Sequence, residues 1–257
     1  MRHVPRYMLR TPADVGSVVE LDEADSHHLV RIVRRHPGDE IELIDGVGGI
    51  YLAALRETGP PARVAVIERR VGPRPSGVVL WVGLTEAARL DLVVEKATEL
   101  GVDEVVVISS ARARRVPDAE AWDRRAARLG RVAEAAARQS GRAVLPSLRG
   151  VVPFDQVIEE IPHGEGLIID PRGDASLAQA LVGPPTRGHR THLLVGPEAG
   201  FSHEEVSAAV AGGIPSATLG PITLRTETAA ITSVVLALAA RGALMPDDEP
   251  KEATSPT

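Results

Sequence analysis

Three loops in the C-terminal half of the chain carry the residue types that could do chemistry. They are Asp170-Pro171-Arg172, residues 196–200 (GPEAG) and residues 219–228 (LGPITLRTET), and each follows an apolar run. Ligands of open α/β sheets bind beyond the carboxyl ends of strands, where glycine lets the backbone approach a ligand and proline stiffens the loop. Each loop alone could be an ordinary turn, but the three together predict one composite pocket for a polar ligand.

Three charged side chains in these loops suit proton transfer or the stabilisation of an anion. Glu198 lies in the second loop, and Arg225 and Glu227 stand two residues apart in the third. A carboxylate can accept a proton, and a guanidinium group stays charged and can hydrogen-bond two acceptors at once. The alternative for Arg225 and Glu227 is a surface ion pair at the start of a helix.

Several other kinds of chemistry are excluded by what the chain lacks. It has no cysteine, which excludes a thiol nucleophile and cysteine-ligated metal centres. It also lacks the P-loop, the H-E-x-x-H zinc helix and the G-x-S-x-G elbow. The run Gly83-Leu84-Thr85 lacks the glycine fingerprint of a dinucleotide site, and His27, His28 and His36 have no matching carboxylate cluster. We therefore expect neither a metal ion nor a nicotinamide cofactor.

The elements that must position these loops alternate between strands and helices. Apolar runs predict strands at 78–82, 104–108, 144–148, 166–169, 192–195 and 216–219. Helical spacing predicts helices at 89–100, 120–140, 202–212 and 226–240, the third started by a Ser202-x-x-Glu205 capping box and the fourth capped by Thr226. This alternation predicts an α/β domain over 78–245 with a mostly parallel sheet covered on both faces.

The rest of the chain has a different character. Residues 1–70 predict a small β-barrel or sandwich with strands at 17–21, 40–44, 50–55 and 63–67, and a short helix at 26–33 capped by Asp25 or Ser26. Residues 71–77 (VGPRPSG) are typical of a linker, and residues 246–257 are typical of a disordered tail.

The charge distribution is uneven along the chain. The net charge is −6, yet residues 112–149 hold ten Arg residues against four acidic ones. A local basic surface attracts phosphate even on an acidic protein. This stretch therefore indicates contact with nucleic acid, although a solvated arginine face is the alternative for each single residue.

Membrane and export signals are not visible. No apolar run reaches the ~18–20 residues of a membrane span, and residues 1–20 lack the apolar centre of a signal peptide. We expect a cytoplasmic protein with no membrane partner.

The loop sequences resemble a known family. LLVGPEAGFSHEEV and LGPITLRTETAAITSV are similar to the last two motifs of SPOUT-class methyltransferases, and more narrowly to the RsmE family, which methylates N3 of a uridine in bacterial 16S ribosomal RNA. The resemblance continues through VEKATELGV (94–102), AAARQSGR (135–142) and DPR (170–172). HHLVRIVRRHPGDEIELIDGVGG resembles the PUA-like RNA-binding barrel of that family, so the likeness covers essentially residues 1–245.

The resemblance implies a trefoil-knotted α/β domain, an obligate homodimer, and S-adenosyl-L-methionine as the cofactor. Its substrate would be 16S ribosomal RNA, either free or within the small ribosomal subunit. The chemistry of methyl transfer to N3 makes Arg225 the candidate cation that stabilises a uridine anion, and Glu198 and Glu227 are the candidate bases; the sequence leaves open which of them, if either, takes the proton. The resemblance assigns cofactor binding to these residues: Asp170, Pro171, Arg172, Gly196, Pro197, Glu198, Ala199, Gly200, Leu219, Gly220, Ile222, Leu224, Arg225 and Thr228.

RNA contacts are expected from arginines of both domains. Those of the first are Arg2, Arg6, Arg31, Arg34 and Arg35, and those of the second are Arg112 and Arg142.

Two other functions compete with methyl transfer. A non-catalytic RNA-binding or ribosome-assembly protein could retain the same fold, although the intact cofactor loops count against it. A nucleotide- or NAD-using α/β enzyme is disfavoured by the missing glycine fingerprint.

Overall fold

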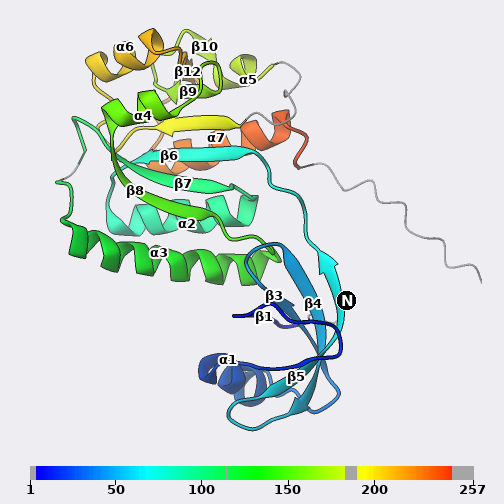
Figure 1. Ribbon diagram of the computed structural model, residues 1–257. Helices are drawn as coiled ribbons and strands as arrows, with labels where there is room; N and C mark the ends of the chain where they lie inside the picture. Colours follow the sequence, from blue (N-terminus) through cyan, green and yellow to red (C-terminus); the bar gives the residue numbers. More distant parts are fainter. Residues whose placement is uncertain (1–3, 114, 183–189, 245–257) are drawn as a thin grey trace, which may run out of the picture.

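The chain forms two sheets that lie one above the other in Figure 1. This computed structural model describes residues 4–113, 115–182 and 190–244, so Arg2 and the tail expected at 246–257 lie outside the described residues. The smaller sheet belongs to the N-terminal part of the chain, and the larger one to the α/β part. The mixed α/β class expected from the sequence is confirmed.

The N-terminal sheet has five strands in the order β1-β3-β4-β5-β2, and only β1 and β3 are parallel. Its core is formed by Tyr7, Leu43, Tyr51 and Val64, which are all nearly inaccessible to solvent. No pairing between β1 and β2 is recorded within the described residues, so the sheet is an open half-barrel. The strands are β1 (Arg6–Met8), β2 (Val18–Glu20), β3 (Glu40–Ile44), β4 (Gly49–Glu57) and β5 (Arg63–Val71).

The short helix of this part starts earlier than the sequence predicted. Helix α1 (Glu23–His27) begins after Asp22, whose carboxylate accepts a hydrogen bond from the Asp25 amide at 2.8 Å. The cap is therefore Asp22 rather than Asp25 or Ser26, because only Asp22 precedes the first turn. A π-helical turn η1 (His28–Ile32) follows, and its Leu29 is fully buried in the core.

The larger sheet has seven strands in the order β10-β12-β9-β11-β6-β7-β8, and every neighbouring pair is parallel. The strand predicted at 144–148 begins instead at Ser147, because Val144 forms β-bridges with Gly46 and Val47 of the N-terminal part. The strands are β6 (Val78–Gly83), β7 (Glu104–Ser109), β8 (Ser147–Pro153), β9 (Gly166–Ile169), β10 (Ala175–Ser176), β11 (Thr191–Val195) and β12 (Ser216–Thr218).

Helices cover both faces of this sheet (Figure 1). Leu80 and Val82 of β6 point to one face, and Val79 and Trp81 point to the other. The first face packs against α2 (Ala87–Leu100), α3 (Ala119–Ser140), α5 (Leu177–Ala180) and α7 (Thr226–Ala240), and the second packs against α4 (Phe154–Glu160) and α6 (His203–Ala211). The parallel, doubly covered sheet expected from the sequence is confirmed, and the trefoil knot stays a prediction.

The ends of the long helices follow local signals with one exception. Helices α2 and α3 end at Gly101 and Gly141, which adopt the left-handed conformation that favours glycine. The capping box of Ser202 and Glu205 starts α6 as expected. Thr226 is not the cap of α7, because the N-cap position belongs to Arg225 and Thr226 is the buried first residue of the helix.

The N-terminal sheet is joined to the C-terminal end of α3. Arg6 donates a hydrogen bond to the Arg138 carbonyl oxygen at 2.8 Å, and the Arg138 side chain donates to Asp25 at 2.8 Å. Beside these bonds lies an apolar cluster of Met8, Ile44, Ile50, Ala137 and Ala143. These hydrogen bonds and this apolar cluster form the seam between the two parts of the chain. The seam fixes the N-terminal sheet on the C-terminal end of α3.

Candidate active site

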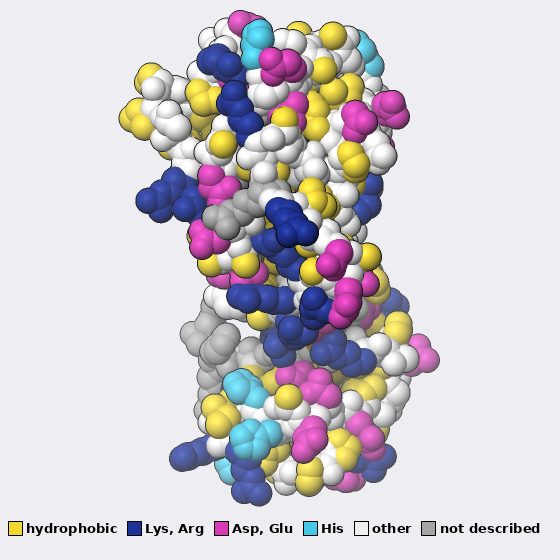
Figure 2. Space-filling view, turned by 90° about the vertical axis from the view of Figure 1, so that its left-hand side faces the viewer, with side chains coloured by type: hydrophobic (Ala, Val, Ile, Leu, Met, Phe, Trp, Pro, Cys, Tyr) yellow, Lys and Arg dark blue, Asp and Glu magenta, His cyan; other side chains and the backbone are white. Residues whose placement is uncertain are grey.

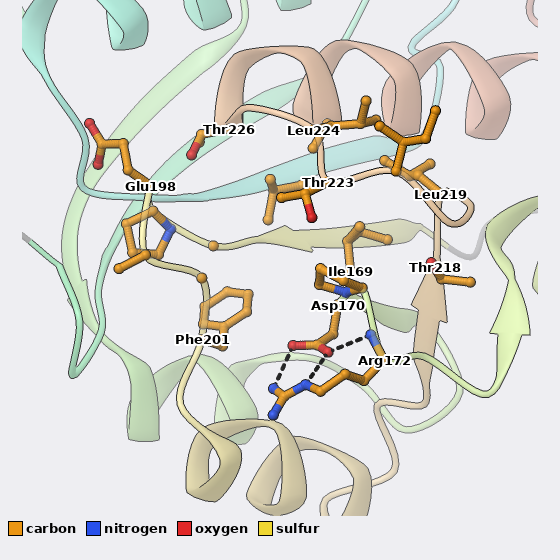
Figure 3. A pocket seen from close by; sticks show the side chains of 18 of the residues that line it. Ile169, Asp170, Arg172, Glu198, Phe201, Thr218, Leu219, Thr223, Leu224 and Thr226 are labelled. Atoms are coloured by element: carbon orange, nitrogen blue, oxygen red, sulfur yellow. Dashed lines mark hydrogen bonds and ion pairs between the residues drawn. The ribbon is translucent and has the colours of Figure 1, made fainter.

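A cavity of about 340 Å³ lies at the carboxyl edge of the large sheet, between the three loops singled out in the sequence (Figure 3). Arg225 and Thr228, which were expected to bind the cofactor, do not line it. The expected residues that do line it are Asp170, Pro171, Arg172, Gly196, Pro197, Glu198, Ala199, Gly200, Leu219, Gly220, Ile222 and Leu224.

The loops pack against the sheet backbone to backbone. A Cβ atom added to Gly83, the last residue of β6, would lie 2.3 Å from the Pro197 nitrogen. A Cβ atom added to Gly173 would lie 2.5 Å from the carbonyl carbon of Ala217. Real Cβ atoms do not approach backbone this closely, so glycine is required at both positions.

The floor of the cavity carries a charged pair. The Asp170 carboxylate accepts hydrogen bonds from Arg172 Nε at 2.8 Å, from Arg172 Nη2 at 2.9 Å and from the Arg172 amide at 2.8 Å (Figure 3). These bonds to Arg172 outweigh burial and hold the pKa of Asp170 below its ordinary value. Asp170 is therefore a charged acceptor, and apolar side chains of Ile169, Leu219 and Leu224 lie near it in the cavity wall.

A single guanidinium group connects the two candidate bases. Arg89, in the first turn of α2, lies 4.0 Å from Glu198 Oε1 and 3.8 Å from Glu227 Oε2, and it also pairs with Glu86 at 3.5 Å. Glu198 lines the cavity, and its carboxylate accepts a hydrogen bond from the Glu86 amide at 3.2 Å. Glu227 is only 13% exposed and does not line the cavity.

Arg89 lies beside this cavity and is a charged residue that the sequence analysis missed, as it missed the lining residues Ile169, Phe201 and Thr223. The usable signal for Arg89 was its place in the helix after β6, since that helix starts at the same sheet edge as the three loops. Arg225 has a different place. It occupies the N-cap of α7 between the cavity-lining residues Leu224 and Thr226, and it is exposed to solvent.

The arginines expected to contact RNA fall into two groups. Arg31 and Arg34 are exposed on or next to η1, Arg35 is half-buried, and Arg112 donates to the carbonyl oxygens of Ala199 and Phe201 at 3.3 Å on the cavity rim. Figure 2 shows the face on which Lys and Arg side chains gather where the two sheets meet.

Two of the expected RNA contacts are held inside the structure instead. Arg142 donates to the carbonyl oxygens of Thr98 at 3.0 Å and Val102 at 2.6 Å, and its side chain is 12% exposed. Burial lowers its pKa to about 10. It satisfies carbonyl groups at the C-terminal end of α2, and its expected role in RNA binding stays a prediction. The Arg6 guanidinium group pairs with Glu42 at 2.5 Å and donates to the Arg138 carbonyl oxygen at 2.8 Å, and its side chain is 23% exposed.

Metal-binding clusters and membrane-spanning helices are both absent from the part of the chain that the structure describes. Among the described residues, no group of three or more His, Asp or Glu side chains is arranged to hold a metal ion. No helix among them is both long enough and apolar enough to cross a membrane.

Comparison with known proteins places this fold and pocket in one class. Residues 73–238 match the model of the RNA methyltransferase domain, and residues 21–67 match the model of the RNA methyltransferase PUA domain. The first match spans more than half of the chain. The two domains are thus those of the RNA methyltransferases that carry a PUA domain.

The similar curated proteins specify the family. The ribosomal RNA small subunit methyltransferase E of Mycobacterium bovis is 30% identical over 234 residues, which cover 89% of this chain and 88% of that protein. The protein of the same name from Bacillus subtilis is 27% identical over 79% of this chain and 82% of its own length. The chain belongs to the ribosomal RNA small subunit methyltransferase E family.

A solved structure agrees over nearly the whole chain. The crystal structure of the ribosomal RNA small subunit methyltransferase E from Neisseria gonorrhoeae, bound to S-adenosyl methionine, superposes with a TM-score of 0.82 at 26% identity. The match covers 94% of this chain and 98% of that chain.

The close approach at Gly83 generates a testable prediction. Gly83→Ala should lower the free energy of unfolding by about 1–3 kcal/mol, because the new methyl group must displace the backbone at Pro197. Gly130→Ala is the matched control, since Gly130 lies in α3 with nothing within 4 Å of its added Cβ. That substitution should stabilise the protein by up to ~1 kcal/mol. Denaturant unfolding of both variants checks the prediction, and equal effects would contradict it.

Proposed function

We propose that this protein transfers a methyl group from S-adenosyl-L-methionine to N3 of a uridine in 16S ribosomal RNA. The observation that carries the proposal is the three-loop cavity with Glu198 in its wall and Arg89 beside it. The family and the methyl donor in the Neisseria gonorrhoeae structure support it. The substrate is the small-subunit RNA in the cytoplasm, free or assembled into the subunit.

The cavity suits the proposed cofactor. Its volume of about 340 Å³ is in the range of small-molecule sites, and its wall combines apolar side chains with loop backbone. Ile169, Leu219 and Leu224 would contact the flat adenine ring, and loop amide and carbonyl groups would fix its edge. Asp170 is a charged acceptor for hydroxyl or amino groups of the ligand. When bound, S-adenosyl-L-methionine supplies an activated methyl group, so the protein needs no nucleophile of its own.

The chain's own residues would handle the proton and the charge. Uridine N3 carries a proton that must leave as the nitrogen lone pair forms its bond to the methyl carbon. Glu198 is the proposed acceptor of that proton because it lines the cavity. Glu227 does not line the cavity and pairs with Arg89 at 3.8 Å. Arg225 would approach from the solvent side and stabilise the negative charge on the uridine carbonyl oxygens. The uridine must be unpaired or extruded, since pairing hides N3.

RNA contacts would run from the cavity rim to the N-terminal part. Arg112 lies on the rim, and Arg31 and Arg34 are exposed near η1. Phosphate contacts of this kind give most of the affinity and make it depend on salt.

Primer extension tests the proposed reaction. Small-subunit RNA from cells that lack the gene is incubated with the purified protein, S-adenosyl-L-methionine and a metal chelator. We expect a new reverse-transcriptase stop at one uridine, because a methyl group on N3 blocks base pairing. RNA binding without any new stop would support the non-catalytic alternative and overturn the proposal.

The role of Arg225 gives a second prediction. Arg225→Ala should lower kcat by about 10²-fold, the order seen when one preorganised transition-state donor is lost. Cofactor affinity should change little, and Arg225→Lys should rescue poorly because an ammonium group cannot span two acceptors. Arg34→Ala is the matched control, which should weaken RNA binding and leave kcat intact. A parallel fall in Tm, cofactor affinity and kcat for Arg225→Ala would instead assign it a purely structural role.

We also propose that the protein acts as a homodimer. Helix α7 buries Ala230, Val234 and Ala237 in its own domain, but Val235 is 36% exposed, as is Leu92 of α2 at 37%. A second copy would cover the apolar side chains that a single chain leaves open. Light scattering at micromolar concentration should give about twice the mass of 27.2 kDa. A monomer that keeps full activity would refute the dimer.

A further inference from the structure

A second cavity lies where β6 leads into α2. It has a volume of about 390 Å³ and is lined by Leu84, Thr85, Glu86, Ala87, Arg115 and Arg125. Glu198 lines the three-loop cavity, and its carboxylate accepts a hydrogen bond at 3.2 Å from the amide of Glu86, which lines the second cavity. The two cavities are therefore neighbours, linked by the hydrogen bond between the Glu86 amide and the Glu198 carboxylate.

The N-terminus of α2 at this cavity is open to an anion. The helix is 14 residues long, its N-cap Glu86 makes no side-chain capping bond, and its first turn holds no acidic residue. The amide of Ala87 is thus one of the helix-end donors without a partner inside the helix. Helix N-termini of this kind attract negative charge through their amide groups and the helix dipole.

Thr85 is an independent indication that this cavity binds a ligand. The residue lines the cavity and is 1% exposed, yet its buried hydroxyl has no hydrogen-bond partner among the described residues. A buried hydroxyl without a partner is unfavourable, so such groups usually bond to a ligand or water. The backbone of Thr85 is fixed as well, because its carbonyl oxygen accepts a hydrogen bond from Arg125 Nη2 at 2.8 Å.

The charge of the cavity favours a phosphate group. Arg115 and Arg125 both line it, and Arg115 is exposed to solvent. The one carboxylate in the lining is Glu86, which is 52% exposed and lies 3.5 Å from Arg89. Two guanidinium groups and a helix N-terminus therefore outweigh a single carboxylate that is already paired.

We propose that this second cavity binds a backbone phosphate of the RNA, adjacent to the nucleotide that is methylated. The proposal rests on the function proposed above. The donors are the Thr85 hydroxyl, the amides at the start of α2 and the guanidinium group of Arg115. A nucleotide carries its base and its phosphate on one sugar, so a base beside Glu198 has its phosphate a short distance away. The second cavity is a neighbouring site with donors for that phosphate, because its lining residue Glu86 is hydrogen-bonded to Glu198.

Two substitutions test the site without disturbing the fold. Thr85→Val removes the hydroxyl and keeps the shape, and Arg115→Ala removes an exposed side chain. Each should raise KM and the equilibrium Kd for small-subunit RNA about tenfold, with kcat at saturating RNA unchanged. Arg115→Ala should also flatten the plot of log Kd against log salt by about 0.7, the value for one lost phosphate contact on a single strand.

The matched control is Arg124→Ala. Arg124 precedes Arg125 on α3, is 66% exposed, and lies outside the cavity lining. It should leave both KM and Kd near the wild-type values. A Tm of Thr85→Val equal to or above the wild-type value is expected as well, because the variant buries no unpaired hydroxyl. If Thr85→Val and Arg115→Ala bind RNA as the control does, the inference is overturned.

Inorganic phosphate distinguishes the two sources of the anion. It is titrated into the wild-type protein and both variants at constant ionic strength, with calorimetry as the readout. Phosphate binding that the variants lose while their Kd for RNA stays normal would identify a free-anion site and overturn the RNA assignment. Loss of RNA affinity in the variants supports the inference even if no methylated uridine is found, so failure of the proposed reaction is recognised separately.

Discussion

The parallel pairing of all seven strands in the large sheet is the constraint on which the rest of the molecule depends. Parallel strands end at one edge, so loops far apart in sequence must meet there. Gly83 and Gly173 then let those loops lie against the sheet without intervening side chains. The shared edge also brings the first turn of α2, with Arg89, to the same place. Both cavities are consequences of this arrangement.

Features encoded by neighbouring residues could be predicted from the sequence. The three loops, the glycine ends of α2 and α3, and the capping box of α6 depend on residues within a few positions of one another. Features that depend on distant contacts were missed or misplaced. Val144 pairs with Gly46 and Val47, so β8 starts late. Arg89 pairs with Glu198 of a distant loop and with Glu227 at the start of α7. No local pattern contains these partners.

The arginines illustrate the same limit in chemical terms. Composition marks residues 112–149 as basic, but it does not separate a solvated guanidinium group from one that satisfies backbone carbonyls. Arg142 is buried and donates to carbonyl oxygens at the C-terminal end of α2, and Arg138 donates to Asp25 of the N-terminal part. Arg112 and Arg115 lie at the two cavities instead. A positive stretch of sequence therefore supplies both side chains that hydrogen-bond within the structure and side chains that line the two cavities.

Helix α3 connects the second cavity with the N-terminal sheet. It has 22 residues, so it spans ~33 Å. Arg125 near its start borders the second cavity, while Arg138 near its end fastens the N-terminal sheet. The length of the helix thus sets the distance between the second cavity and the N-terminal sheet. Adding one residue to α3 would lengthen the helix by only about 1.5 Å, but it would rotate the N-terminal sheet by about 100° about the helix axis relative to the second cavity.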